Sequence, residues 1–205
     1  MIVYAESNFL LELAYLQEEH EACEQILALA EAGRVQLRIP AFCAIEARMS
    51  LARRVSERKQ FSVALLRQIR ELARSKPHSA LPDQSSGLTS ALIASGEEER
   101  KRLDAALARI TSPDTILPTT SAVLGRAEAA QARYELSPQD ALVYASVAVH
   151  AERTPDPAAC FLTRNSKDFA DPEIREELAR AGCKLLFSFS DGLGYANRPG
   201  ASPLP

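Results

Sequence analysis

The chain has 205 residues, of which 46% are hydrophobic and 25% are charged, and its net charge is −3. This length fits one substantial α/β domain or two very small ones, with the composition of an ordinary soluble globular protein. No run approaches 18 consecutive apolar residues, and the N-terminus lacks the features of a signal peptide, so we expect no membrane association and a cytoplasmic location.

Short apolar segments alternate with longer helical patterns along the chain. Strands are predicted over residues 2–6, 35–39, 114–117, 159–163 and 183–187. Helices are predicted from Ser7 or Asn8 and over 20–32, 41–75, 88–110, 119–134, 138–152 and 172–182, with a loop over 76–87. This alternation predicts a parallel sheet with helices on both faces.

The C-terminal residues differ in composition from the rest. From Ser190 onward the sequence is rich in Gly and Pro and has little to bury. We therefore expect one domain over residues 1–189 and a loose tail over 190–205. The four cysteines form no C-x-x-C pair and fall in apolar runs, which favours buried, reduced thiols over a zinc site.

Polar side chains follow the predicted strands. Glu6 ends the first strand, and Glu46 lies one turn into the helix after the second. Asp140 begins the helix in SPQDALVYASV, and Asn165 and Asp168 follow the fourth strand in FLTRNSKDF. Parallel sheets place their sites at the carboxyl ends of strands. Carboxylates gathered there would raise one another's pKa, which bound Mg²⁺ or Mn²⁺ would relieve because both ions prefer oxygen ligands.

Each acid also has a structural explanation. Glu6 could be a favourable charge at a helix N-terminus, and Glu46 could pair with an arginine on the same helix. Asp140 lies in a capping-box pattern with Pro at the first helical position, and Asp168 could be a turn residue. No single position decides between the two interpretations, whereas the shared placement at strand ends favours a metal site.

Four stretches together resemble PIN-domain nucleases, the family that includes the VapC-type toxins of toxin–antitoxin pairs. They are VYAESNFLLELA, IPAFCAIEARMSL, LSPQDALVYASVAVHA and FLTRNSKDF, and they span most of residues 1–187. The resemblance implies a three-layer α/β/α fold with a central parallel sheet. Small PIN toxins are shorter than this chain, and the extra length would form a long helical insertion over about residues 47–112.

The resemblance also implies a set of site residues. The family's catalytic positions are matched by Glu6, Glu46, Asp140 and Asn165. The metal ligands would be Glu6, Glu46, Asp140 and Asp168. Asn8 and Thr163 match polar positions that support the acidic cluster. Two positions depart from the family pattern, because Glu6 is one methylene longer than the common Asp and Asn165 carries no charge.

The activity implied by the resemblance is cleavage of RNA with one or two Mg²⁺ or Mn²⁺ ions. The ions would activate a water for in-line attack on a phosphodiester, leaving a 5′-phosphate and a 3′-hydroxyl. Arg164 is a candidate phosphate contact or, alternatively, a solvated side chain. The expected partners are RNA, an antitoxin protein if the chain is a toxin, and a second copy in a homodimer.

The predicted insertion is strongly basic. Residues 48–76 carry nine basic and two acidic side chains, a net charge of +7, so the rest of the chain carries −10. This charge favours binding of a polyanion, and Arg53, Arg54 and Arg58 are the predicted RNA contacts. The alternative is a solvated helix face without a ligand.

Two functions remain open from the sequence. The preferred interpretation is a metal-dependent endoribonuclease, acting as the toxin of a toxin–antitoxin pair or as a stand-alone enzyme. The alternative is a catalytically weak or inactive PIN-fold module that binds nucleic acid or regulates a partner. The departures at Glu6 and Asn165 keep this alternative open.

Overall fold

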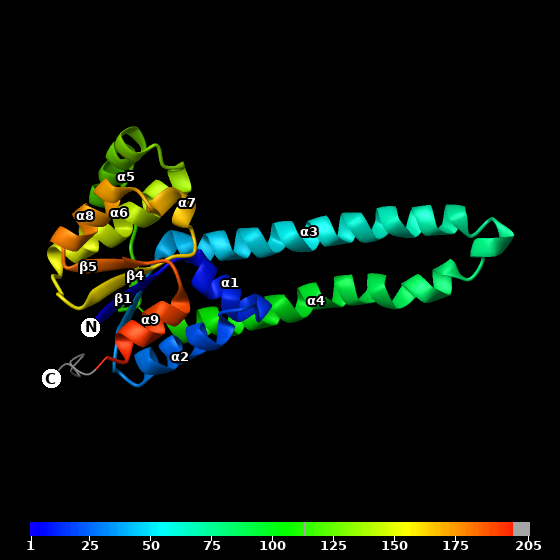
Figure 1. Ribbon diagram of the computed structural model, residues 1–205, viewed down its shortest axis with the longest axis horizontal. Coiled ribbons are helices and arrows are strands. Elements are labelled where there is room, and N and C mark those ends of the chain that lie inside the picture. The colour runs from blue at the N-terminus through cyan, green and yellow to red at the C-terminus, as the bar shows by residue number, and fades with distance from the viewer. Residues whose placement is uncertain (113, 199–205) are drawn as a thin grey trace.

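Five strands form one parallel sheet in the computed structural model, which describes residues 1–112 and 114–198 (Figure 1). The strand order is β3-β2-β1-β4-β5. The strands are β1 (Ile2–Ala5), β2 (Gln36–Pro40), β3 (Ile116–Leu117), β4 (Ala159–Leu162) and β5 (Cys183–Leu186). All residues of β1 and β4 are buried, as expected for central strands covered on both faces.

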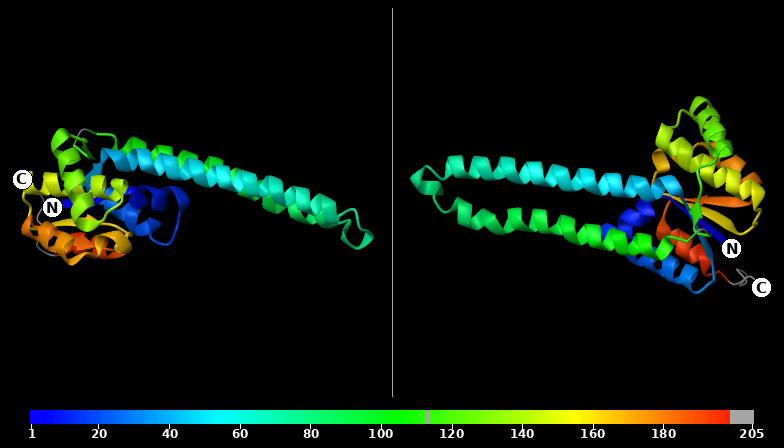
Figure 2. Two further views of the ribbon diagram at one scale, coloured as in Figure 1. Left: turned by 90° about the horizontal axis from the view of Figure 1, so that it is seen from above. Right: turned by 180° about the vertical axis from the view of Figure 1, so that it is seen from behind.

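Helices cover both faces of this sheet, which confirms the predicted three-layer fold. In Figures 1 and 2, α5, α6 and α8 lie on one face, and α1, α2 and α9 lie on the other. The helices are α1 (Ser7–Tyr15), α2 (His20–Glu31), α3 (Ala41–Leu72), α4 (Leu81–Ile110), α5 (Ser121–Tyr134), α6 (Pro138–Arg153), α7 (Ser166–Phe169), α8 (Pro172–Arg180) and α9 (Phe189–Ala196), with a 3₁₀ turn, η1, at Lys76–His78. Among the described residues, none of these helices is long and apolar enough to cross a membrane.

The strand order determines where a site can form. The chain runs from β1 to β2 and β3 on one side of the sheet and then crosses to β4 and β5 on the other side. The switch point therefore lies between β1 and β4, which pair in parallel with Ala5 opposite Leu162. Consequently, the residues that follow these strands, Glu6 and Thr163, emerge side by side at the edge where open α/β sheets bind ligands.

The predicted insertion forms an arm of two antiparallel helices, α3 and α4, that extends away from the sheet (Figures 1 and 2). The structure corrects the predicted loop over 76–87, because α4 begins at Leu81. Pro82 lies in the first turn of α4, where a missing N–H costs nothing. Gly87 lies inside the helix, where the cost is about 1 kcal/mol. Both residues were therefore misleading as loop signals.

The C-terminal residues also differ from the prediction. A loose tail was expected from Ser190, but residues 189–196 form α9, which packs on the sheet. Phe189 is fully buried and contacts Phe9 edge to face, with ring centroids 5.6 Å apart. Gly192 lies against Leu162 of β4. The remaining part of the predicted tail, residues 199–205, lies outside the described residues.

The packing of α9 can be tested by two glycine substitutions in the same helix. A Cβ on Gly192 would lie 2.5 Å from Cδ2 of the buried Leu162, whereas a Cβ on Gly194 would have no atom within 4 Å. Gly192→Ala should lower the free energy of unfolding by about 1–3 kcal/mol because it overpacks the core. Gly194→Ala should leave it unchanged or raise it by up to about 1 kcal/mol. Urea denaturation measures both, and equal effects would contradict this packing.

Candidate active site

Glu6 is a buried carboxylate at the switch point of the sheet. The residue is only 5% exposed. It is the N-cap residue of α1, but its side chain makes no capping hydrogen bond to that helix. Three donors bind its Oε1: the Thr163 hydroxyl at 2.7 Å, the Asn8 amide at 2.9 Å and the Arg164 backbone N–H at 3.0 Å. Oε2 receives no hydrogen bond from the described residues. One oxygen is thus fixed, and the other is left for a further ligand.

The environment of Glu6 opposes its ionisation. Burial raises the pKa of Glu6 above its ordinary value, and the charge of Glu46 raises it further. The hydrogen bonds to Oε1 lower the pKa, but burial is the largest influence. A bound cation would reverse this balance, since it favours the charged carboxylate.

Asp140 and Asn165 contact each other across the site. The Asn165 amide donates a hydrogen bond to Asp140 Oδ1 at 3.0 Å. Asn165 also caps α7, because its Oδ1 accepts from the Asp168 backbone N–H at 3.4 Å. Ser137 caps α6 through the Asp140 backbone N–H, so the capping pattern read from the sequence is present. Asp140 therefore belongs to a helix cap and also faces the site.

Glu46 is the third acid whose charge acts on the buried thiol of Cys43, together with Glu6 and Asp140. Burial raises the pKa of Cys43 well above its ordinary value, and three negative charges add to this rise: Glu6, Glu46 and Asp140. Glu46 is half-buried and forms no ion pair within the described residues. Its neighbour Arg48 instead pairs with Asp104 at 2.7 Å. The charges of the three predicted acids thus all act on the same buried thiol.

These acids do not form a ready metal site. Over residues 1–112 and 114–198, no three His, Cys, Asp or Glu side chains are placed closely enough to hold an ion together. Repulsion between carboxylates would separate them when no cation is bound, and Asp140 is already held by Asn165. The carboxylate donors still suit Mg²⁺ or Mn²⁺ in their chemistry. Binding of an ion would require these side chains to move toward a common point.

Arg164 has partners within the chain. Its guanidinium hydrogen-bonds Glu12, whose side chain is only 3% exposed, and lies 3.6 Å from Glu18 and 3.8 Å from Glu19. The predicted role of Arg164 as a phosphate contact is therefore not supported by its surroundings. Glu12 was missed in the sequence, although a carboxylate within the apolar run of α1 indicates a buried cationic partner. The pair helps to fix the segment that binds Glu6.

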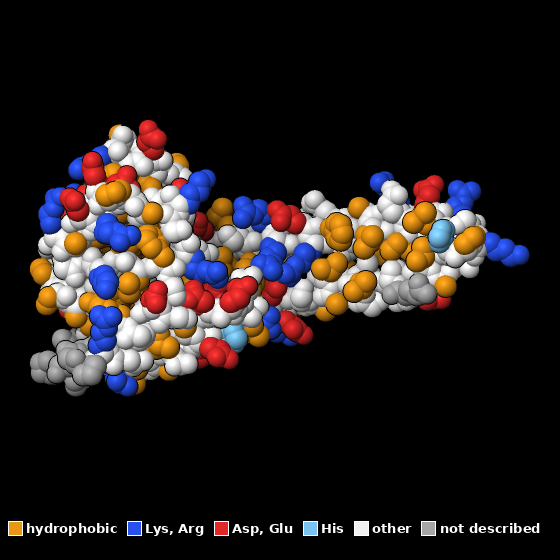
Figure 3. All heavy atoms as spheres, viewed as in Figure 1, with side chains coloured by type: hydrophobic (Ala, Val, Ile, Leu, Met, Phe, Trp, Pro, Cys, Tyr) orange, Lys and Arg blue, Asp and Glu red, His pale blue; other side chains and the backbone are white. Residues whose placement is uncertain are grey.

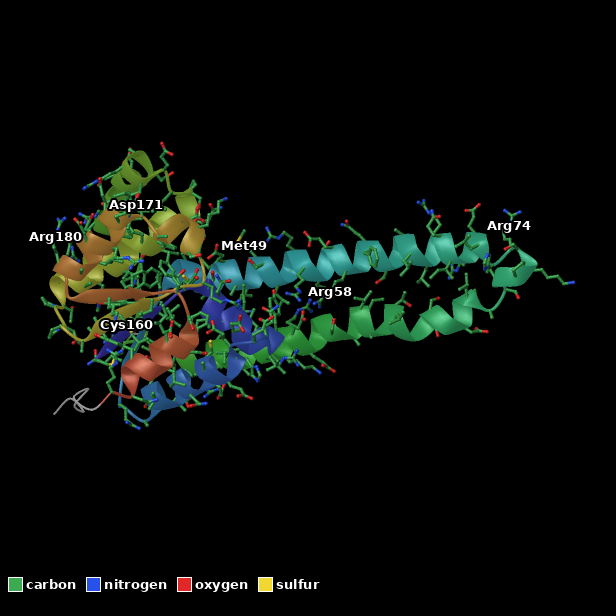
Figure 4. All side chains as sticks on the ribbon, in the orientation of Figure 1. Met49, Arg58, Arg74, Cys160, Asp171 and Arg180 are labelled. Carbon is green, nitrogen blue, oxygen red and sulfur yellow. The ribbon has the colours of Figure 1, made fainter. Side chains whose placement is uncertain are left out.

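Two of the three predicted RNA contacts also face inward. Arg58 lies between α3 and α4, where it bonds Ser95 at 2.9 Å and Glu99 at 2.8 Å (Figure 4). Arg54 stacks on the ring of Tyr15, with its guanidinium carbon 4.1 Å from the ring centroid. Of the three, only Arg53 is exposed. Prediction from charge alone did not separate structural arginines from available ones.

A hollow lined by three arginines lies away from Glu6, Glu46 and Asp140. It has a volume of about 620 Å³ and includes Asp156 and Gly182, which precede β4 and β5. Its arginines are engaged by acids, since Arg126 bonds Glu152 and Arg133 bonds Glu173. We therefore assign the candidate site to the carboxyl ends of β1 and β4.

The Asn165 contact gives a testable prediction. Asn165→Asp should destabilise the metal-free protein by about 1–3 kcal/mol, because a carboxylate would replace the donor that holds Asp140. The same change should strengthen Mn²⁺ binding, since it adds an oxygen ligand of negative charge. The melting temperature with and without Mn²⁺ measures both effects. Asn165→Ala is the control, and an equal metal-induced rise in the two variants would contradict the prediction.

Comparison with known proteins gives one family. A family model described as a PIN domain matches residues 3–169, a range that contains Glu6, Glu46, Asp140 and Asn165. No curated protein matches the chain, and no solved structure matches it. The family match agrees with the five-stranded parallel sheet and with the placement of the acids at its edge.

Proposed function

The chain belongs to the PIN-domain family, and from this premise we propose that it is a metal-dependent endoribonuclease. PIN domains are generally nucleases and typically use divalent metal ions. One observation supports the proposal most strongly: the buried Glu6 at the switch point binds three donors through Oε1 and none of the described residues through Oε2, and the charges of Glu46 and Asp140 act on the same buried Cys43. Structural ion pairing does not explain this arrangement, because no cation of the described residues is paired with these three acids.

Each site residue would have its own role in the proposed reaction. The ligands of Mg²⁺ or Mn²⁺ would be Glu6, Glu46, Asp140 and Asp168. The bound ion would supply an activated water and neutralise charge on the phosphate. Thr163 and Asn8 would keep Glu6 in one orientation through Oε1. Asn165 would hold Asp140 in place through its amide. Hydrolysis forms a bond from the water oxygen to phosphorus and breaks the bond to the 3′-oxygen.

The activity is tested with the purified chain and a mixed pool of RNAs. Cleavage should require Mn²⁺ or Mg²⁺, should stop with EDTA and should be lost in Asp140→Asn. Products that form equally in EDTA would exclude the metal mechanism. An absence of products with every RNA, together with retained RNA binding, would favour the alternative of an inactive binding module. A toxin role would further require that expression arrests growth and that Asp140→Asn does not.

The exposed edge of α3 is the part of the arm that we propose contacts RNA. This edge consists of Arg53, Lys59, Arg67 and Arg70, with Arg74 just beyond the end of the helix, and all five are exposed. Changing Arg53, Lys59 and Arg67 to Ala should weaken RNA binding and flatten its dependence on salt, with turnover at saturating RNA nearly unchanged. Filter binding over a range of salt concentrations measures this. A collapse of turnover with unchanged binding would instead place the edge in the active site.

A further inference from the structure

The distal arm exposes large apolar side chains and buries small residues. Phe61 and Leu88 are 59% and 67% exposed. Among the described residues from 61 to 98, the buried ones are Ser62, Thr89 and Gly96. A helix pair in water normally buries its large apolar residues. The arm therefore carries an apolar surface that its own two helices do not cover.

Helical spacing places these apolar residues on one face of the arm. The stripe on α3 consists of Arg54, Phe61, Leu65 and Leu72. The stripe on α4 consists of Leu81, Leu88, Leu92, Ser95 and Arg102. Successive members are three, four or seven residues apart, which returns the side chain to nearly the same direction on a helix. We call the distal part of the two stripes the apolar groove: Phe61, Leu65, Leu72, Leu81, Leu88 and Leu92.

Helix α1 covers the proximal end of the same two stripes. Arg54 stacks on Tyr15 of α1, and Arg102 Nε donates a 2.7 Å hydrogen bond to the carbonyl oxygen of Ala14. Figure 1 shows α1 in front of the arm at its base, and in the same view Figure 3 shows apolar side chains along the arm beyond it. The groove thus continues a surface on which one helix already packs.

The charge around the apolar groove indicates what covers it. The six members of the apolar groove are uncharged, and so are Gln68 and Ser85, which lie between them at helical spacing. Two such surfaces can meet without repulsion between like charges. A polyanion or an anionic membrane would instead be attracted to the basic edge of α3, where Lys59, Arg67 and Arg70 surround Val63.

We propose that the apolar groove is a homodimer interface, in which the arms of two copies pack groove to groove as a four-helix bundle. Two helices form only one layer, and a second layer of helices is the common way to bury the apolar face of the first. An exposed apolar patch that spans two helices is also unusual on a monomer. This proposal goes beyond the nuclease function and does not depend on it.

The test is the oligomeric state of the full chain by sedimentation velocity over a wide range of concentrations. The wild type should dimerise, and Phe61→Glu and Leu88→Glu should each raise the dimer dissociation constant at least about tenfold. Val63→Glu is the matched control, because Val63 is 63% exposed but lies two residues, or about 200°, away from Phe61 around α3. Helix content by circular dichroism should remain equal in all four proteins.

Three results would overturn the proposal. The first is a wild type that stays monomeric at every concentration. The second is a dimer that survives both groove substitutions, and the third is an equal loss of the dimer in Val63→Glu. Binding of a monomeric wild type to vesicles of anionic lipid, lost in Leu88→Glu, would assign the groove to a membrane surface instead.

Discussion

Replacing Glu6 with Gln is expected to abolish metal-dependent RNA cleavage while raising the melting temperature of the metal-free protein. Gln keeps an oxygen for the three donors that bind Oε1, so the local structure should persist. It removes a charge that burial disfavours and that Glu46 repels. Loss of a metal ligand should lower turnover by at least about 100-fold. The metal-induced rise in melting temperature should also shrink.

The effect of Glu6→Gln on stability should depend on pH. Because the pKa of Glu6 is raised in the folded state, the folded protein holds this proton more tightly than the unfolded chain. The free energy of unfolding of the metal-free wild type should therefore fall as pH rises from the ordinary value of 4.5 through the raised pKa. The variant lacks this loss, so its advantage should be absent below pH 4.5 and complete above the raised pKa.

Glu18→Gln is the control for these measurements, because the Glu18 side chain is 80% exposed. This variant should match the wild type in cleavage, in stability without metal and in the metal-induced rise. If Glu6→Gln also shows the full metal-induced rise, Glu6 is not a ligand, and the proposed metal site loses its central residue.

Arg58→Ala is expected to destabilise the arm by about 3–5 kcal/mol, because it leaves the buried carboxylate of Glu99 without a partner. The side chains of Arg58 and Glu99 are 20% and 7% exposed, and they join α3 to α4. The double variant Arg58→Met/Glu99→Leu should recover most of the loss, since no buried charge remains. Hydrogen exchange of α3 and α4 measures the stability of the arm directly.

Arg48→Ala provides a comparison within the same pair of helices. Arg48 pairs with Asp104, but these side chains are 57% and 51% exposed, so its loss should cost less than about 1 kcal/mol. Equal losses of stability in Arg48→Ala and Arg58→Ala would show that leaving the buried Glu99 unpaired carries no extra free-energy cost. The same double variant is also useful in RNA-binding measurements, because it removes the charge of Arg58 without the loss of arm stability that is expected for Arg58→Ala.

Much of the fold could be predicted because each element has its own local signal. The strands are short apolar runs, and the structure confirms the predicted cap at Ser137 and the helix start at Pro172. The prediction failed where local signals conflict with tertiary packing. Gly192 suggested a loose tail, but the missing Cβ is what allows α9 to approach Leu162.

The site was predictable to a similar degree. The carboxyl ends of parallel strands lie at one edge of the sheet, so the sequence implied that Glu6, Asp140 and Asn165 would lie at that edge, where Asn165 contacts Asp140. The orientation of the arginines did not follow, because it depends on how helices cross. Arg54 stacks on the ring of Tyr15, a residue of another helix, and Arg58 forms an ion pair with Glu99. A net charge of a segment does not reveal which of its cations are already neutralised.

The uninterrupted course of α3 has a mechanical consequence. The helix contains 32 residues and so spans about 48 Å, with Glu46 in its second turn and its other end beside η1 at the tip of the arm. Glu46 and the arm thus belong to one rod, whereas Glu6 follows β1 and Asp140 lies on α6. A twist or tilt imposed on the arm would move one acid of the group relative to the other two. Movement of the arm would therefore change the distances between the three carboxylates.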